Sequence, residues 1–177
     1  MGLHFDNEEF RNRRNRLLEL IAENELDGML LFRQESMFYL TGYDTFGYVF
    51  FQCLYLGGDG KLILLTRAPD LRQARNTSIV EDIRIWVDGP EGNPALQLKE
   101  ILRECGCAGQ RLGVEYDSYG LTAKNGKMLD SALDGFCELS DASELVNRLR
   151  VVKTSEELVY VRKAAELADD ALDEAHR

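Results

Sequence analysis

The sequence predicts an α/β fold in which helices flank a mixed β-sheet. Three observations predict this class: helix-type and strand-type segments alternate, one hairpin interrupts the alternation, and the composition is ordinary for a packed protein. The chain has 177 residues, of which 45% are hydrophobic and 29% charged, with a formal net charge of -10. A chain of this length buries a core without disulfides or metals. Alternating elements favour parallel strand pairing and the hairpin adds an antiparallel pair, so we expect a mixed sheet.

The first quarter of the chain predicts a helix, a buried strand and a short helical turn. Asp6 and Glu9 have the spacing of a capping box, and the helix after them carries an apolar face. Residues 29–32 form a continuous apolar run, which is typical of a strand covered on both faces. Ser36 is expected to cap a single helical turn that Gly42 ends. The apolar face of the first helix consists of Phe10, Leu17, Leu18 and Ile21.

The next segments predict a hairpin followed by alternating helices and strands. Two strand-type runs, 48–56 and 61–66, are joined by Gly57-Gly58-Asp59-Gly60, which suits an antiparallel hairpin. Pro94 is well placed in the first turn of a helix that carries Leu96, Leu98, Ile101 and Leu102 and stops at Gly106. The remaining expected elements are a helix at 69–76, a strand at 83–87, a strand at 112–116, a helix at 121–133, a strand at 136–139 and a helix at 142–150.

A long helix is predicted at the C-terminal end. Thr154 and Glu157 form a second capping box, and nothing breaks the helix from there to Arg177. About 23 residues at 1.5 Å each give a length of roughly 35 Å. One face carries Leu158, Val161, Ala165, Ala168 and Leu172. This face either folds back on the chain's own sheet or packs against a surface beyond Arg177 or on a second subunit, and we favour the second alternative.

The composition excludes several classes of function. A net charge of -10 disfavours binding to nucleic acid or to anionic lipid. No apolar run reaches the roughly 18 residues of a membrane span, and the first residues lack a secretory signal, so we expect a cytoplasmic protein. The four cysteines are scattered, and the two histidines, His4 and His176, lie at opposite ends. We therefore predict no catalytic and no metal-ligating residue in this chain.

Two segments resemble known family motifs. Residues 37–43, Met-Phe-Tyr-Leu-Thr-Gly-Tyr, resemble the Tyr-Leu-Thr-Gly-aromatic signature of the N-terminal domain of the creatinase, prolidase and aminopeptidase P family. Residues 150–157, Arg-Val-Val-Lys-Thr-Ser-Glu-Glu, resemble the Arg-x-x-Lys-Ser-x-x-Glu linker that leads into the catalytic domain of that family. The order and separation of the two segments also match, so the resemblance covers the whole chain.

The resemblance implies a division of the chain and of the chemistry. Residues 1–149 would be the creatinase/prolidase-type N-terminal domain, with a ribonuclease H-like core. Residues 150–177 would be the linker and first helix of a truncated C-terminal "pita-bread" catalytic domain. The missing part of that domain would hold two divalent metal ions of the Mn or Co type and cleave an amide or peptide bond, as in Xaa-Pro peptidases. Creatine-like and ectoine-like amides remain alternative substrates, and this chain alone would be inactive.

The same resemblance implies a site and partners. In this family the N-terminal domain supports homodimer formation, and its loops border the active site of the partner subunit. The corresponding residues here are Tyr43, Asp44, Phe46 and Tyr48, so we expect them at the rim of a substrate pocket. Aromatic rings suit such a rim because they combine shape with a polar edge. The alternative is that these rings, Tyr48 above all, pack as core.

Two other functions remain open at this stage. Glu115, Asp117 and Asp88 at strand ends could hold magnesium for phosphodiester cleavage, although the acidic net charge opposes a nucleic-acid substrate. A stand-alone interaction module could instead use the long C-terminal helix to bind a partner protein. Arg33, just before the first motif, is either an exposed polar end or a contact for a carboxylate.

Overall fold

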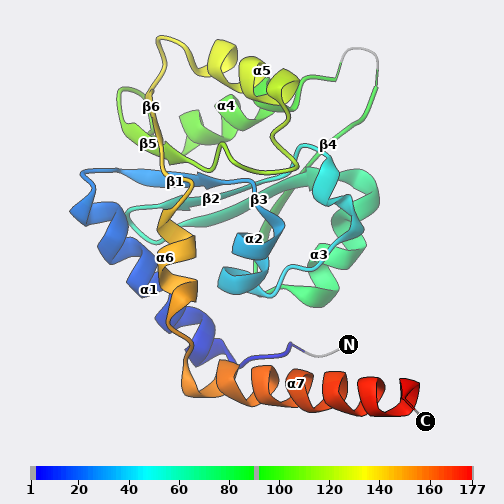
Figure 1. The fold of residues 1–177 in the computed structure, drawn as a ribbon. Helices are drawn as coiled ribbons and strands as arrows, with labels where there is room; N and C mark the ends of the chain where they lie inside the picture. Colours follow the sequence, from blue (N-terminus) through cyan, green and yellow to red (C-terminus); the bar gives the residue numbers. More distant parts are fainter. Residues whose placement is uncertain (1–2, 90–91, 177) are drawn as a thin grey trace.

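A computed structural model describes residues 3–89 and 92–176 and shows a three-layer arrangement with one projecting helix (Figure 1). A six-stranded sheet has the order β4-β3-β2-β1-β5-β6. Its strands are β1 (Gly28–Leu31), β2 (Cys53–Gly57), β3 (Leu62–Arg67), β4 (Asp82–Trp86), β5 (Arg111–Val114) and β6 (Glu138–Asp141). The α-helices are α1 (Asn7–Glu23), α2 (Gln34–Thr41), α3 (Leu71–Thr77), α4 (Pro94–Glu104), α5 (Ala123–Leu133), α6 (Leu145–Val151) and α7 (Ser155–Ala175), and the 3-10 helices are η1 (Phe46–Val49) and η2 (Ala68–Asp70).

The sheet is mixed, as the sequence predicts. Strand β1 pairs antiparallel with β2 and parallel with β5, so that Leu30 lies between Tyr55 and Val114. The β2–β3 hairpin supplies the second antiparallel pair, and β4 and β6 add parallel edges. Strands β1 and β2 are buried along their whole length, which accounts for their continuous apolar runs.

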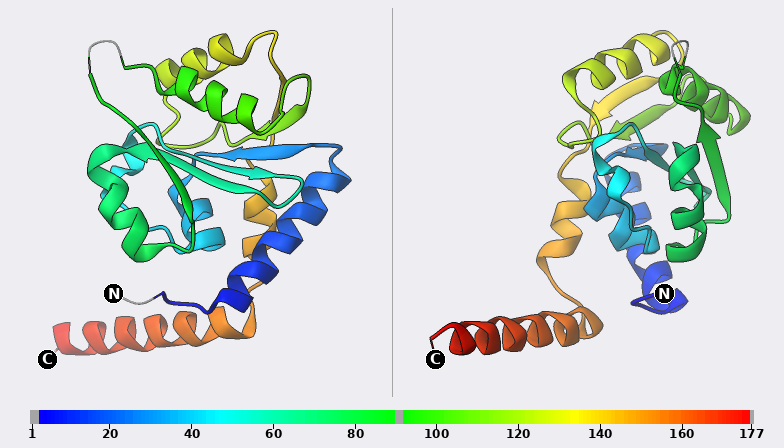
Figure 2. Two further views of the ribbon diagram at one scale, coloured as in Figure 1. Left: turned by 180° about the vertical axis from the view of Figure 1, so that it is seen from behind. Right: turned by 90° about the vertical axis from the view of Figure 1, so that its right-hand side faces the viewer.

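Helices cover both faces of the sheet and divide the core in two. Helices α4 and α5 lie on one face, whereas α1, α2, α3 and α6 lie on the other (Figures 1 and 2). Leu30 points into the first core, with α4 and α5, and its neighbours Met29 and Leu31 point into the second, with α1, α2 and α6. This alternation follows from the two-residue period of a strand. None of the described helices is both long and apolar enough to cross a membrane.

Several local predictions are confirmed at their caps. Asp6 accepts a hydrogen bond from the Glu9 amide at 2.8 Å, and Gly42 ends α2 with a φ of 79°. The capping box of Thr154 and Glu157 is complete at the start of α7. The Glu9 side chain departs from its expected capping role, because it accepts hydrogen bonds from Arg13 and Thr154.

Other local predictions are wrong. Ser36 does not cap α2, because the helix begins two residues earlier, and its hydroxyl instead bonds Glu115. The expected strand at 48–56 begins only at Cys53, since residues 46–49 form η1. Leu96 lies on the exposed side of α4 rather than on its apolar face.

Helix α7 does not fold back on the sheet, so the first of the two alternatives is wrong. Every residue from 159 to 176 is exposed, and the helix runs beneath the body of the domain (Figures 1 and 2). Contacts near its start attach it. Thr154 Oγ1 donates to Glu9 Oε1 at 3.0 Å, Arg13 Nη2 lies 3.2 Å from Glu157 Oε1, and Tyr160 Oη donates to the His4 carbonyl at 2.7 Å.

Two glycines test the backbone assignments. At Gly42, an alanine would hold a positive φ and place its Cβ 2.9 Å from the Thr77 carbonyl, so we expect Gly42→Ala to destabilise the fold by about 1–2 kcal/mol. Gly126 lies inside α5 with nothing within 4 Å of a Cβ, so Gly126→Ala should stabilise the fold by up to about 1 kcal/mol. Urea unfolding of both variants measures the two changes in the free energy of unfolding. If the two substitutions change it in the same direction, the backbone conformation assigned to one of these glycines is wrong.

Candidate functional site

The loop that follows α2 contains all four predicted site residues, but the structure separates them. Asp44 is exposed, Phe46 is 89% exposed and Tyr48 is 47% exposed, whereas Tyr43 is fully buried. The Tyr43 hydroxyl donates to Gln52 Oε1 at 2.6 Å and lies 3.2 Å from Thr66 Oγ1. Burial raises the pKa of Tyr43, so this hydroxyl remains a donor. Tyr43 therefore belongs to the core and cannot line an exposed rim.

Buried polar contacts hold this loop in shape. Thr45 Oγ1 donates to Asp70 Oδ1 at 2.9 Å and accepts from the Gly47 amide, and Gln52 Nε2 donates to the Gly47 carbonyl at 2.8 Å. A Cβ at Gly47 would come within 2.2 Å of Gln52 Nε2 and 2.8 Å of the Asp70 carboxylate oxygens, so a larger residue there would have to displace these hydrogen-bonded side chains. The exposed rings of Phe46 and Tyr48 thus flank a fixed backbone position, which limits the number of conformations that the loop can adopt.

Tyr119 extends the aromatic surface and was missed by sequence reasoning. Its ring is 77% exposed and meets the Tyr48 ring edge to face, with 6.2 Å between the centroids. A hollow of about 220 Å³ lies between these two rings and is also bordered by Arg33 and Glu35. The sequence feature that could have identified Tyr119 is its position in the loop after the carboxyl end of a predicted strand, because such loops commonly carry functional residues.

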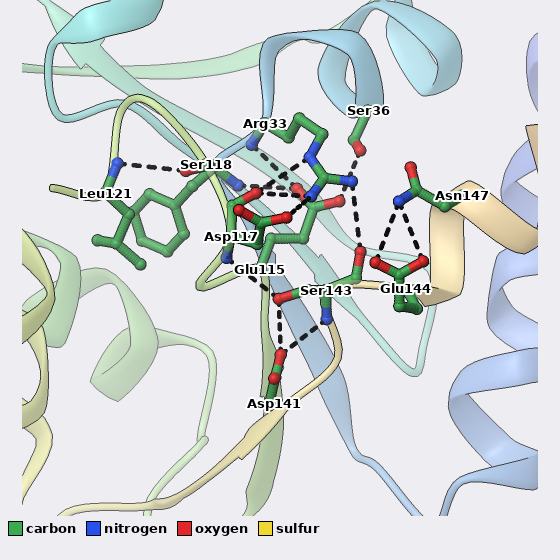
Figure 3. Close-up of polar contacts among 11 residues, drawn as sticks. Arg33, Ser36, Glu115, Asp117, Ser118, Leu121, Asp141, Ser143, Glu144 and Asn147 are labelled. Carbon is green, nitrogen blue, oxygen red and sulfur yellow. Dashed lines mark hydrogen bonds and ion pairs between the residues drawn. The ribbon is translucent and has the colours of Figure 1, made fainter.

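A polar network underlies this surface at the carboxyl ends of β1, β5 and β6 (Figure 3). Glu115, directly after β5, is fully buried. Its Oε2 accepts from the amides of Phe32 and Arg33 at 3.1 and 3.0 Å, and its Oε1 accepts from Ser36 Oγ at 2.5 Å. One carboxylate therefore joins the end of β5 to the end of β1 and the first turn of α2.

Arg33 is a carboxylate contact rather than a free polar end. Its Nη2 donates to the Asp117 carbonyl at 2.6 Å and to Asp117 Oδ2 at 3.1 Å, and its Nη1 reaches the Ser143 carbonyl at 3.5 Å. Ser143 in turn donates to Asp141 Oδ1 from both its hydroxyl and its backbone amide. These two hydrogen bonds lower the pKa of Asp141. Figure 3 shows how this second set of contacts connects the loops after β5 and β6.

The magnesium alternative is wrong. Glu115 is buried in the interior, whereas Asp117 is exposed and forms an ion pair with Arg33. Asp88 forms a separate ion pair, with 3.8 Å between its Oδ2 and Arg67 Nη1. In the described ranges, 3–89 and 92–176, no group of three or more His, Cys, Asp or Glu side chains could hold a metal ion. Glu115, Asp117 and Asp88 therefore do not form a shared metal site.

Burial dominates the ionisation of Glu115 and makes stability depend on pH. Removal from water raises the pKa of Glu115 to about 7, against the opposing effect of its hydrogen-bond donors. The folded state therefore holds this proton up to about pH 7, whereas the unfolded chain releases it near 4.5. Glu115 therefore contributes fully to the free energy of unfolding below pH 4.5. This contribution is lost as the pH rises towards 7, which lowers the free energy of unfolding by about 3 kcal/mol.

Glu115→Gln isolates this effect. The amide oxygen can still accept from the Phe32 and Arg33 amides, and the amide nitrogen can donate to Ser36 Oγ. Urea unfolding between pH 4.5 and 7.5 should show that the free energy of unfolding of the parent chain, relative to the variant, falls as the pH rises. A constant difference between the two proteins across this range would contradict the assignment.

Comparisons with known proteins place this geometry in a family. The profile of the Creatinase/Prolidase N-terminal domain matches residues 13–152. The ectoine hydrolase of Halomonas elongata is 28% identical over 94% of this chain and 43% of its own length, and an uncharacterized hydrolase/peptidase, y4tM, of Sinorhizobium fredii is 27% identical over 98% and 46%. The crystal structure of a dipeptidase from Pyrococcus horikoshii OT3 superimposes with a TM-score of 0.76 at 25% identity, over 92% of this chain and 43% of that one.

The chain thus spans less than half the length of these relatives. The matched profile covers both cores of the sheet and ends at residue 152, just before α7 begins. The chain belongs to the creatinase/prolidase N-terminal domain family.

Proposed function

We propose that this chain is the non-catalytic N-terminal domain of a longer creatinase/prolidase-type hydrolase, joined by α7 to the catalytic part. The observation that carries the proposal is the family match over residues 13–152, together with relatives named as hydrolases and peptidases that are about twice as long. The domain would end near residue 149, and residues 150–177 would be the linker and first helix of the next domain. The exposed stripe on α7 supports this division, because an apolar helix face needs a partner surface.

The longer enzyme would cleave an amide or peptide bond, with Xaa-Pro peptides as the first substrate class to test. Two divalent ions of the Mn or Co type would bind in the part beyond α7, because the described residues offer no metal site. When bound, such ions activate a water molecule for attack on the amide carbon. We place the enzyme in the cytoplasm and propose that it acts as a homodimer.

The role of this domain would be to border the active site of the partner subunit. The exposed rings of Phe46 and Tyr48 and the carboxylate of Asp44 are available for this role, and Tyr119 continues the same surface. The hydrogen bonds that hold the backbone at Gly47 support it, because a rim that is ordered before binding costs less conformational entropy. Tyr43 would act only indirectly, by holding the loop to the core.

The first experiment is to assay the chain and its longer form. The 177-residue chain should show no turnover of Xaa-Pro dipeptides with manganese or cobalt, because its described residues contain no metal site. The gene should continue beyond α7 into a part whose product does hydrolyse an amide or peptide. A stop codon after Arg177 would instead favour the alternative function, a stand-alone interaction module that uses the exposed face of α7.

The rim is tested by Phe46→Ala and Tyr48→Ala in the longer enzyme. Both side chains are exposed, so the melting temperature should hardly change, whereas kcat/KM should fall by about tenfold or more if the rings contact substrate. Leu96→Ala is the matched control, since Leu96 is similarly exposed but lies on α4. Unchanged kinetics in both aromatic variants would remove this loop from the substrate site.

A further inference from the structure

Strand β4 forms one free edge of the sheet. The strand order β4-β3-β2-β1-β5-β6 leaves β4 and β6 at the two edges, and among the described residues neither has a strand on its outer side. Figure 2 shows β4 along the margin of the sheet. The outer N–H and C=O groups of such an edge strand are available to pair with the edge strand of another chain.

The β4 edge has few of the features that usually prevent such pairing. Natural edge strands are protected by a proline, a bulge, a lysine or a covering segment. Strand β4 contains neither proline nor lysine, and its five residues pair with β3 in an uninterrupted register. Ile85 is 44% exposed, and Val87, directly after the strand, is 67% exposed. The edge therefore combines unpaired backbone with exposed apolar side chains.

The charges of the two edge strands differ. Strand β6 has the sequence Glu-Leu-Ser-Asp, with two carboxylates and no basic residue, so two antiparallel copies of it would bring like charges together. Strand β4 carries both signs, because Asp82 and Arg84 lie two residues apart on the same face and form an ion pair within the chain. Of the two edges, β4 is the one whose charges match those of a second copy.

The charge pattern of β4 selects one antiparallel register. A two-fold axis perpendicular to the sheet keeps each face of both strands on its own side, so every register centres on one residue of the strand. Centring on Asp82 or on Arg84 sets that charge against its own copy. Centring on Ile85 sets Asp82 against Asp88, and centring on the last residue leaves half of β4 unpaired. Centring on Ile83 sets Asp82 opposite Arg84 twice, and no like charges lie opposite each other.

The side chains suit this register. Arg84 and Asp82 have 43% and 36% of their side chains exposed, so both are accessible to a second copy. Opposed residues of an antiparallel pair have Cβ atoms about 4.5–5.5 Å apart, which is within reach of an ion pair. Each Arg84 would therefore lie between Asp82 of its own chain and Asp82 of the other copy. Ile83 would meet its own copy at the centre, and Ile85 would lie opposite Glu81.

We propose that the edge of β4 is an interface with a second copy of this chain, in which two β4 strands pair antiparallel about Ile83 and join two six-stranded sheets into one. The inference rests on the proposed function only for the homodimer itself, to which that proposal assigns no pairing surface. The end of β4 lies beside the rim loop, because Trp86 Nε1 donates to the Phe51 carbonyl at 3.0 Å. A second copy paired here would lie next to that loop.

Charge reversal in the 177-residue chain tests the pairing. The parent chain should form dimers in a concentration-dependent way over the micromolar range, as measured by sedimentation velocity. Asp82→Arg leaves two basic residues at the edge and Arg84→Asp leaves two acidic ones, so each variant alone should lose the dimer. An equimolar mixture of the two variants should form it again, because every opposed pair then carries opposite charges.

Two controls accompany the charge variants. Lys127→Asp changes the net charge as Arg84→Asp does, but on the exposed side of α5, and should dimerise as the parent chain does. Asp82 and Arg84 are exposed, so the melting temperatures of their variants should hardly change.

Disulfide trapping tests the register. Glu81 and Ile85 lie opposite each other in the proposed pairing, and the Cα separation of an antiparallel pair suits a disulfide. A mixture of Glu81→Cys and Ile85→Cys chains should therefore cross-link on mild oxidation with copper phenanthroline, and far more than either variant alone. Leu96→Cys, exposed on α4, replaces one member of the mixture as the control and should give no such gain.

A parent chain that stays monomeric over this range, or charge variants that each associate as the parent does, would overturn the pairing at β4. The proposed function would still stand in that case if the longer protein hydrolyses an amide or peptide. A longer protein without hydrolase activity would contradict the proposed function and leave the pairing of this chain in place.

Discussion

One buried carboxyl group, that of Glu115, holds the centre of this domain together. Strand β5 lies beside β1 in the sheet, but the ladder between them is short, with three residue pairs. Glu115 extends that ladder by accepting from the backbone of Phe32 and Arg33 and from the Ser36 side chain. These bonds satisfy amide groups where β1 passes into α2, and so fix the direction in which α2 leaves the sheet. The position of the aromatic loop after α2 follows from that direction.

Hydrophobic pattern was enough to predict most of the fold. The buried runs at β1 and the β2–β3 hairpin, and the caps at Gly42 and Thr154, are local signals that tertiary packing did not override. Ser36 was misassigned because its real partner, Glu115, lies 79 residues further along the chain. A serine near the start of a helix is a reasonable cap candidate in any sequence. Its bond to Glu115 becomes apparent only once β1 and β5 are known to pair.

The candidate site was less predictable than the fold. The segment from Tyr43 to Tyr48 reads as one aromatic loop, yet its first ring is core and its later rings are surface. The difference arises from Gln52 and Thr66, which offer hydrogen bonds to the Tyr43 hydroxyl from β2 and β3. Burial of a tyrosine depends on such a partner for its hydroxyl, and no spacing within the loop specifies it. Tyr119 was missed for the same reason, since its neighbour Tyr48 is distant in sequence.

The place of β1 in the sheet has a consequence for the order of assembly during synthesis. Strands β1 to β4 lie within residues 28–86 and form four adjacent strands of the sheet, so this half can pair as soon as it leaves the ribosome. One open edge of this half is β1, which is buried along its whole length in the finished domain, until β5 arrives about 80 residues later. The nascent chain therefore exposes an apolar strand edge during that interval, and the arrival of Glu115 closes it.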